Sequence, residues 1–312
     1  MGRYLIAGAA GYVGSRLAEY LLAQGHYVRG LVRDPDKEVV EQLAAQGMAV
    51  WQGDVTQPES LVGVAGGIDY VYNLTARSVL DNGSVQRVFV EGNRNLIAAC
   101  SRARAVRSYI FASNTAPYGD RGDAWLSEDT PVAPCYPLGQ IMVEAEQAVM
   151  DLVRAHHFPA IILRIGIIYG PEHDFIDAVR NGTATLIGDG FNFIPRIHID
   201  DLIYMLDRVA VDGQPGAVYN VVDDEPARAA EFYGEVRRRL GMVPPRSFPK
   251  DAALFAGMDP SVVGMAAAST RLSNRRIRQE LAMQLRYPSF RAWLDERLED
   301  PVLIEREAAV AG

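Results

Sequence analysis

Short apolar runs alternate with longer amphipathic stretches along the first two-thirds of the chain. The apolar runs predict β-strands at residues 3–8, 27–33, 48–53, 69–75, 108–113 and 160–166. The stretches between them have helical spacing; in one of them, Val13, Leu17 and Leu21 share one face, and Gly25 follows the end. Strands that alternate with helices predict a doubly wound α/β fold, in which helices cover both faces of a parallel sheet.

The pattern loosens after about residue 172. Glycine and proline become frequent there, and helices are predicted near residues 200–211, 229–241 and 273–298. This change predicts a smaller C-terminal lobe beside the sheet.

Composition and charge argue against several classes of function. The formal net charge is −8, which argues against a nucleic-acid surface, since such a surface needs a basic stripe. No apolar run approaches the ~18 residues of a membrane helix, and the start of the chain lacks the features of a signal peptide. Cys100 and Cys135 lie far apart, and no Cys/His cluster has zinc-ligand spacing. We therefore expect a cytoplasmic protein without disulfides or a metal site.

A glycine-rich segment lies between the first predicted strand and the first predicted helix. The segment "YLIAGAAGYVGSRL" places three glycines at a spacing of three residues. A tight turn at this point lets backbone N–H groups and the helix N-terminus face a pyrophosphate. We expect a dinucleotide to be held here by Gly8, Gly11, Tyr12, Val13 and Gly14.

The end of the second strand bears on which nicotinamide dinucleotide is bound. An NAD site usually has an acidic residue there for the ribose 2′-hydroxyl, whereas "LVRDPDK" offers Arg33 first and Lys37 nearby. A guanidinium can bind a 2′-phosphate with two hydrogen bonds, and an ammonium adds charge. Asp34 could instead hold an unmodified ribose. The sequence therefore favours NADP(H) over NAD(H).

Further motifs follow along nearly the whole chain. They are "VEGNRNLIAAC" (90–100), "FASNTAPYGD" (111–120), "EDTPVAP" (128–134), "LRIGIIYGP" (163–171), "RIHIDDL" (196–202) and "RLSNRRIRQELAMQLRYPSFRAWL" near the end. Together with the glycine spacing, they resemble the extended short-chain dehydrogenase/reductases, the group of nucleotide-sugar epimerases, dehydratases and dihydroflavonol reductases. The resemblance implies a Rossmann sheet with a smaller C-terminal substrate lobe, and a homodimer.

The resemblance also implies a domain organisation and further cofactor contacts. We expect a dinucleotide-binding domain at 1–170 with 196–222 returning to it, a substrate-binding lobe at 171–195 and 223–300, and a tail at 301–312. In this family the segments after the third and fourth strands flank the adenine and the ribose–nicotinamide bridge. That correspondence adds Asp54, Val55, Leu74, Thr75 and Ala76 to the expected cofactor contacts.

The segment "APCYPLGQIMVEAEQ" (133–147) departs from the catalytic motif of this family. The family has a tyrosine and a lysine four residues apart. An ungapped match places Leu138 and Met142 at those positions, and Asn114 at the position of the usual serine or threonine. A second match takes Tyr136 as the tyrosine but puts Gln140 at the lysine position.

The usual acid–base relay is therefore not expected. The chain has only two lysines, and neither lies in this segment. A tyrosine hydroxyl, with a pKa near ~10, exchanges protons readily at neutral pH only when a neighbouring positive charge favours the phenolate. At the lysine position, Met142 has the helical spacing of a packing residue.

Four other residues are candidates for the catalytic role. Asn114 and Thr115 could orient a substrate oxygen, and Tyr136 could reach into the same cleft. His173 follows the sixth strand, and a histidine can exchange protons near neutral pH without help. The alternative is that Tyr136 and His173 are surface loop residues. For His198, the resemblance implies a structural hydrogen bond.

These observations predict an atypical NADP(H)-dependent oxidoreductase that acts on a small, partly apolar carbonyl or alcohol compound. Phe191 and Phe193 favour an apolar or aromatic ligand, unless both rings belong to the core of the lobe. Two alternatives remain open because fold does not determine function. One is a non-redox isomerase, cyclase or lyase, and the other is a non-enzymatic NADP-binding sensor or partner subunit.

Overall fold

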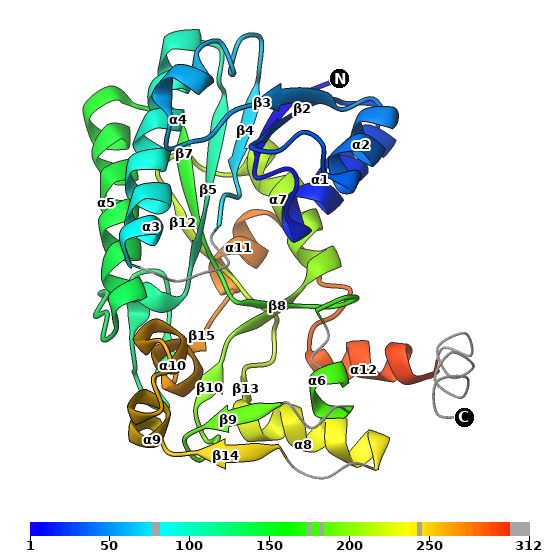
Figure 1. Ribbon diagram of the computed structural model, residues 1–312, viewed down its shortest axis with the longest axis vertical. Helices are drawn as coiled ribbons and strands as arrows, with labels where there is room; N and C mark the ends of the chain where they lie inside the picture. The colour runs from blue at the N-terminus through cyan, green and yellow to red at the C-terminus, as the bar shows by residue number, and fades with distance from the viewer. Residues whose placement is uncertain (77–81, 174–175, 181–183, 242–244, 300–312) are drawn as a thin grey trace.

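A seven-stranded parallel sheet forms the centre of the larger domain in the computed structural model (Figure 1). The structure describes residues 1–76, 82–173, 176–180, 184–241 and 245–299. The strands of this sheet, in spatial order, are β3 (Ala49–Gln52), β2 (Tyr27–Val32), β1 (Arg3–Ala7), β4 (Tyr70–Asn73), β5 (Ser108–Asn114), β7 (Ala160–Ile165) and β12 (Val218–Val221). The predicted doubly wound α/β fold is confirmed, and the expected tail at 301–312 lies outside the described residues.

The order of the strands reverses at β1. This strand pairs with β2 on one side and with β4 on the other, both in parallel register. In a doubly wound sheet, the carboxyl ends of the strands at such a reversal leave a crevice in which ligands bind. The glycine-rich segment follows β1 and therefore lies at this crevice.

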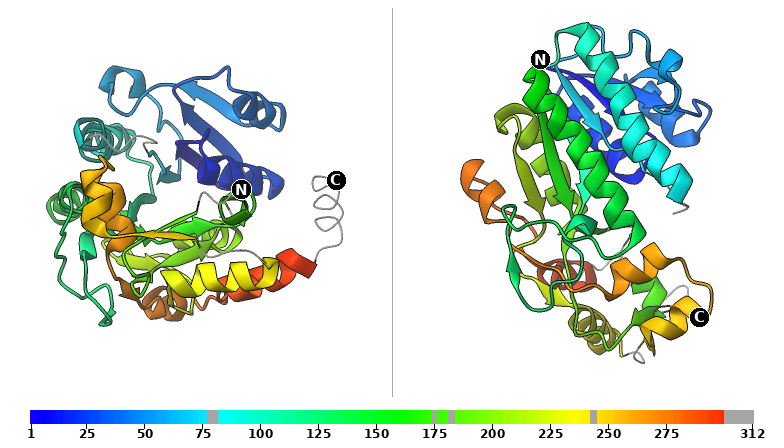
Figure 2. Two further views of the ribbon diagram at one scale, coloured as in Figure 1. Left: turned by 60° about the horizontal axis from the view of Figure 1, so that its bottom comes forward. Right: turned by 90° about the vertical axis from the view of Figure 1, so that its left-hand side faces the viewer.

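Helices cover both faces of the sheet because alternate strand residues point to opposite faces. Tyr4 and Ile6 of β1 pack in one core with α1 (Tyr12–Ala23), α2 (Glu38–Ala45) and α7 (Ile199–Asp212). Leu5 and Ala7 pack in a second core with the helices on the opposite face of the sheet. Those helices are α3 (Asn82–Gln86), the π-helical turn η2 (Arg87–Gly92), α4 (Asn93–Ala103) and α5 (Pro137–His156). Figure 2 shows α4 and α5 side by side over the sheet.

A smaller lobe lies below the carboxyl edge of the sheet (Figure 1). Its elements are β8 (Ile167–Tyr169), α6 (Ile176–Arg180), β9 (Thr185–Ile187), β10 (Phe193–Ile194), β11 (Arg196–His198), β13 (Ala227–Arg228), α8 (Ala229–Leu240), β14 (Arg246–Phe248), α9 (Lys250–Phe255), α10 (Pro260–Ala267) and α12 (Phe290–Glu299). Its core gathers Tyr169, Phe232, Phe290 and Trp293. Short elements lie between the two parts: η3 (Ala116–Tyr118), β6 (Trp125–Leu126), β15 (Arg271–Leu272) and α11 (Arg275–Glu280). The 3₁₀ turn η1 (Pro58–Leu61) belongs to the larger domain, where it packs against α4.

The helical region predicted at 273–298 is two helices, α11 and α12. Ala282 has a left-handed φ of 48°, and Pro288, which cannot donate a helical hydrogen bond, precedes α12. Between the two helices, the backbone N–H groups of Arg286 and Tyr287 each donate to the carboxylate of Asp201, at 2.8 Å. Tertiary hydrogen bonds to Asp201 therefore hold an extended segment where the apolar spacing suggested continuous helix.

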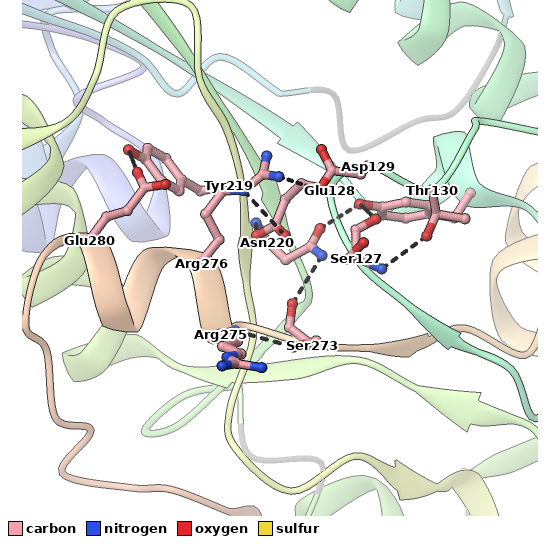
Figure 3. A network of polar contacts seen from close by, with 11 residues as sticks. Ser127, Glu128, Asp129, Thr130, Tyr219, Asn220, Ser273, Arg275, Arg276 and Glu280 are labelled. Carbon is pink, nitrogen blue, oxygen red and sulfur yellow. Dashed lines mark hydrogen bonds and ion pairs between the residues drawn. The ribbon is translucent and has the colours of Figure 1, made fainter.

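A network of polar contacts holds α11 and the loop at residues 127–130 against the edge strand β12 (Figure 3). The backbone N–H of Asn220 donates to Glu128 Oε1 at 3.0 Å, and its side-chain amide donates to the carbonyl of Ser273 at 3.1 Å. Arg276 of α11 donates to Asp129 at 2.6 Å. The network thus joins β12 to two segments that are distant in sequence.

In the part of the chain that the structure describes, no helix is long and apolar enough to cross a bilayer.

Candidate active site

The turn between β1 and α1 has room only for glycine at two positions. Gly8 has a φ of 88°, and a Cβ there would lie 2.8 Å from the carbonyl oxygen of Leu74. A Cβ on Gly14 would lie 2.2 Å from the carbonyl oxygen of Gly8. These approaches bring the N-terminus of α1 against the end of β1, where backbone N–H groups can face an anion.

A first cavity, which we call the β2 pocket, opens at the ends of β1, β2 and β4. Its volume is about 440 Å³. The predicted cofactor residues that line it are Gly8, Gly11, Arg33, Lys37, Asp54, Val55, Leu74, Thr75 and Ala76. Asp34 lines the same pocket. The acidic residue that would favour NAD(H) and the two cations that would favour NADP(H) therefore lie at one rim.

Some polar side chains of the β2 pocket are already hydrogen-bonded within the protein, and others are not. Asp54 accepts hydrogen bonds from the backbone N–H and the hydroxyl of Thr56, both at 2.8 Å. Asp34 accepts the backbone N–H of Asp36 at 3.2 Å. The exposed side chains of Arg33 and Lys37 make no hydrogen bond or ion pair with any residue that the structure describes. The two cations are therefore available to a ligand.

A second cavity, the cleft, adjoins the β2 pocket and has a volume of about 460 Å³. The two cavities share Gly11, Leu74 and Ala76. The cleft brings together the remaining predicted residues, which are Tyr12, Val13, Gly14, Asn114, Thr115, Tyr136 and His173. All the residues that the sequence analysis singled out for the cofactor or for catalysis therefore line one of two adjoining cavities.

Asn114 ends β5 with its amide held in one orientation. Its Oδ1 accepts the backbone N–H of Ala116 at 2.9 Å, so the Nδ2 group is the end that can donate. Nδ2 makes no hydrogen bond within the described part of the chain. Asn114 thus presents a fixed donor, without a transferable proton, to the cleft.

Tyr136 precedes α5 and is a buried residue, not a surface loop residue. It is 8% exposed, and its ring packs where a side chain on Gly264 of α10 would lie. Burial, together with the nearby Cys135, raises its pKa above the ordinary value near 10. The hydroxyl of Tyr136 is therefore less acidic than that of a tyrosine beside a lysine.

The two positions that match the usual tyrosine and lysine both lie in the core. Leu138 is 4% exposed, and Met142 is fully buried with Ala145 and Val149, as predicted for a packing residue. The backbone N–H of Leu138 donates to the hydroxyl of Ser261 in α10, at 3.1 Å. The small lobe therefore satisfies a free amide at the start of α5.

A buried ion pair lies next to the end of β5 and is hydrogen-bonded to it through Ser113. Arg164 of β7 donates to both carboxylate oxygens of Glu146 in α5, with the shorter contact at 2.7 Å. The hydroxyl of Ser113 donates to the same carboxylate at 2.6 Å. The pair therefore ties β5, β7 and α5 together directly next to Asn114.

His198 has the structural role expected of it. It is 1% exposed, and its Nδ1 accepts the backbone N–H of Asp200 at 3.2 Å, which makes it the N-cap of α7. Burial, with a smaller contribution from Arg286, lowers its pKa to about 3. His198 is therefore neutral at physiological pH.

The apolar walls of the cleft come from residues that the sequence analysis did not select. Phe191 is 63% exposed, and Phe193 is buried under the guanidinium of Arg228. The expectation that these rings face the ligand is wrong, because the residues that line the cleft in this region are Ile194 and Pro195. The other apolar walls are Ile165, Ile167, Ile168, Met265 and Ala268.

Among the described residues, no group of three potential metal ligands occurs.

Comparison with known proteins places this site in context. The sequence model of the NAD dependent epimerase/dehydratase family matches residues 4–222. The 3-diazoavenalumate denitrifying reductase of a Streptomyces species is 29% identical over 93% of this chain and 98% of its own length. The dTDP-glucose 4,6-dehydratase of Bacillus anthracis in complex with NAD has a TM-score of 0.80 at 19% identity, covering 98% of this chain and 97% of its own. A human epimerase family protein with NADPH has a TM-score of 0.78 at 22% identity, covering 96% and 99%.

Proposed function

Because this chain belongs to the NAD-dependent epimerase/dehydratase family, we propose that it is an NADP(H)-dependent oxidoreductase that reduces a small, partly apolar compound. The observation that carries the proposal is the pair of adjoining cavities that extends from the glycine-rich turn to Asn114 and Tyr136. A dinucleotide would lie along this path, with its pyrophosphate at the turn. When bound, its nicotinamide would supply the hydride.

Arg33 and Lys37 support NADP(H) over NAD(H). Their side chains lie at the rim of the β2 pocket, unpaired within the described chain. A guanidinium can donate two hydrogen bonds to a 2′-phosphate, and an ammonium contributes a second positive charge. Asp34, which would favour a plain ribose, already accepts a backbone N–H within its own turn.

The walls of the cleft support a largely apolar substrate with an aromatic or aliphatic ring. Ile167, Ile194 and Met265 approach it from three different segments. Apolar walls of this kind desolvate a diphosphate at a high cost, so they favour a ring over a nucleotide sugar. Asn114 would donate a hydrogen bond to an oxygen atom on this ring.

The source of a proton distinguishes two substrate classes. Reduction of a carbonyl requires a proton at the developing alkoxide. Tyr136 has a raised pKa, and both lysines of the chain lie elsewhere: Lys37 at the β2 pocket and Lys250 at the start of α9. A carbonyl substrate would therefore take its proton from water, from His173 or inefficiently from Tyr136.

Diazo compounds form the second substrate class. The Streptomyces relative is named as a reductase of a diazo compound. An aryl diazonium ion accepts one hydride, so that a C–H bond replaces the C–N bond and the electron pair of the broken C–N bond leaves with N₂. Because no proton is consumed, this reduction does not require a tyrosine–lysine relay. The missing relay thus favours an aryl diazonium substrate over a carbonyl substrate.

A fluorescence titration with NADPH and NADH tests the cofactor assignment. We expect NADPH to bind at least about tenfold more tightly than NADH, and Arg33→Ala or Lys37→Ala to weaken NADPH binding by about tenfold each. Lys250→Ala removes an exposed lysine outside both cavities and should leave both affinities unchanged. If neither nucleotide binds, the redox proposal is wrong, and a cofactor-free isomerase, cyclase or lyase becomes the leading alternative.

A matched pair of substrates tests the reaction. 4-Methoxybenzaldehyde and 4-methoxybenzenediazonium share one ring and differ in the group that is reduced. NADPH consumption above the protein-free rate with the aldehyde would support the carbonyl class, and consumption with release of N₂ would support the diazo class. If NADPH binds tightly but a wider panel of aryl carbonyl and diazo compounds is not reduced, the chain fits an NADP-binding sensor better than an enzyme.

A further inference from the structure

A short segment after β8 reaches across to the first turn of α1. We call residues 170–173 the strap. The hydroxyl of Tyr12 donates to the carbonyl of Pro171 at 2.5 Å, across 159 positions of sequence. The ring of His173 lies against the ring of Tyr12, with the two centroids 4.1 Å apart. The strap therefore joins the loop after β8 to the glycine-rich turn.

Arg16, one turn further along α1, makes a second connection. Its guanidinium carbon lies 4.0 Å from the centroid of the Tyr12 ring, and its Nη2 lies 3.1 Å from Glu172 Oε2. Tyr12 and Arg16 are four residues apart, so they lie on the same face of α1. Three consecutive residues of the strap thus contact this one face.

The base of the strap is fixed, whereas its tip depends on these contacts. A Cβ on Gly170 would lie 2.7 Å from Ile199 Cγ2 and 2.9 Å from Nε2 of the buried His198. Gly170 therefore packs directly on the start of α7. Glu172, in contrast, has a left-handed φ of 68°, which is unfavourable for a residue with a side chain. The contacts to Tyr12 and Arg16 offset this cost.

The position of the strap relates it to the cofactor path. Tyr12 and His173 line the cleft together with Gly11 and Gly14 of the turn that would hold a pyrophosphate. We propose that the strap is a latch, which closes over the nicotinamide half of a bound dinucleotide and must release Tyr12 before the dinucleotide can leave. This inference rests on the proposed function, since it requires a dinucleotide in the cleft.

Stopped-flow measurement of NADPH release from the purified protein tests the latch. Tyr12→Phe keeps the ring but removes the hydrogen bond to Pro171, and it should increase the release rate about fivefold. Glu172→Gln removes an exposed ion pair and should increase release about twofold, an effect that high salt should reproduce in the unmodified protein. Because an open strap also speeds entry, the equilibrium affinity should change less than the release rate.

Asp212→Asn is the matched control. It removes another exposed ion pair, Arg208–Asp212, at the far end of α7, and release should stay at the rate of the unmodified protein. If Tyr12→Phe changes NADPH release by less than about twofold, the latch is wrong even though the cofactor site is right. If the unmodified protein does not bind NADPH, the proposed function itself fails.

Hydrogen exchange in the nucleotide-free protein examines the closed strap by itself. The amide of His173 donates to the carbonyl of Gly170 at 3.0 Å, so it reports on the conformation of the strap. We expect the peptide that contains residues 170–173 to exchange faster in Tyr12→Phe than in the unmodified protein. Equal exchange would overturn the claim that Tyr12 holds the strap closed.

Discussion

The ring of Tyr136 occupies the space that a side chain on Gly264 would need. A Cβ at Gly264 would lie 2.4 Å from Cγ of Tyr136 and 2.6 Å from its Cβ. These atoms are the rigid base of the side chain, so the ring cannot move aside by a simple rotation. α10 can therefore approach the start of α5 only because residue 264 is glycine.

Gly264→Ala should lower the free energy of unfolding by about 2 kcal/mol through overpacking against Tyr136. Thermal or urea unfolding would measure this change. Gly234→Ala in α8 is the control, because a Cβ at Gly234 meets no atom within 4 Å. That control should be neutral or stabilise by up to about 1 kcal/mol, since alanine is a better helix former. Equal stabilities for the two variants would contradict the packing described for Tyr136.

Asn114→Asp should separate the two hydrogen-bonding ends of this side chain. The carboxylate retains an acceptor for the backbone N–H of Ala116 but lacks the donor that faces the cleft. We expect kcat/KM for the aryl substrate that the protein reduces to fall by at least about tenfold, with a change in unfolding free energy below about 0.5 kcal/mol. Asn114→Ala should lose both activity and stability. A fully active Asn114→Asp variant would show that the donor is not used.

The buried pair of Arg164 and Glu146 should be sensitive to the loss of one partner. Glu146→Leu leaves the guanidinium of Arg164 uncompensated and should destabilise the protein by about 3 kcal/mol. The double variant Glu146→Leu/Arg164→Met removes both charges and should recover most of that loss. Urea unfolding of the three proteins gives the comparison. A double variant less stable than Glu146→Leu would indicate that Arg164 has partners more important than Glu146.

Stability should depend on pH through His198. Its pKa is about 3 in the folded protein and near ~6.5 in the unfolded chain, so the unfolded chain binds more protons between these values. The free energy of unfolding should therefore fall as the pH drops below 6.5, by about 2 kcal/mol between pH 7.5 and pH 5. His198→Asn keeps an acceptor for the amide of Asp200 and does not titrate, so this dependence should flatten. An unchanged pH profile in the variant would assign the effect to another group.

Local patterns made much of the fold predictable. The six predicted strands agree with the structure to within two residues, and all of them except the edge strand β3 are largely buried apolar runs. The glycine-rich turn was also predictable, since the spacing of Gly8 and Gly14 reflects a close approach within one short segment. The cofactor residues after β2, β3 and β4 followed from the rule that the carboxyl ends of parallel strands share one edge.

Contacts between distant segments were not predictable in this way. The cleft walls Ile167, Ile194 and Met265 are ordinary apolar residues, and nothing in their neighbouring sequence distinguishes them from core positions. The contact of Tyr12 with Pro171 likewise joins the start of α1 to a loop that only the finished fold brings near it. The homodimer and the cytoplasmic location remain predictions.

The carboxylate of Glu128 protects an open edge of the sheet. Among the described residues, no strand pairs with the outer side of β12, and an uncovered sheet edge would offer N–H and C=O groups to a strand of another molecule. Because Glu128 accepts the outward N–H of Asn220, a foreign strand would have to displace a charged side chain before it could pair there. The polar network around β12 therefore also guards the protein against edge-to-edge aggregation.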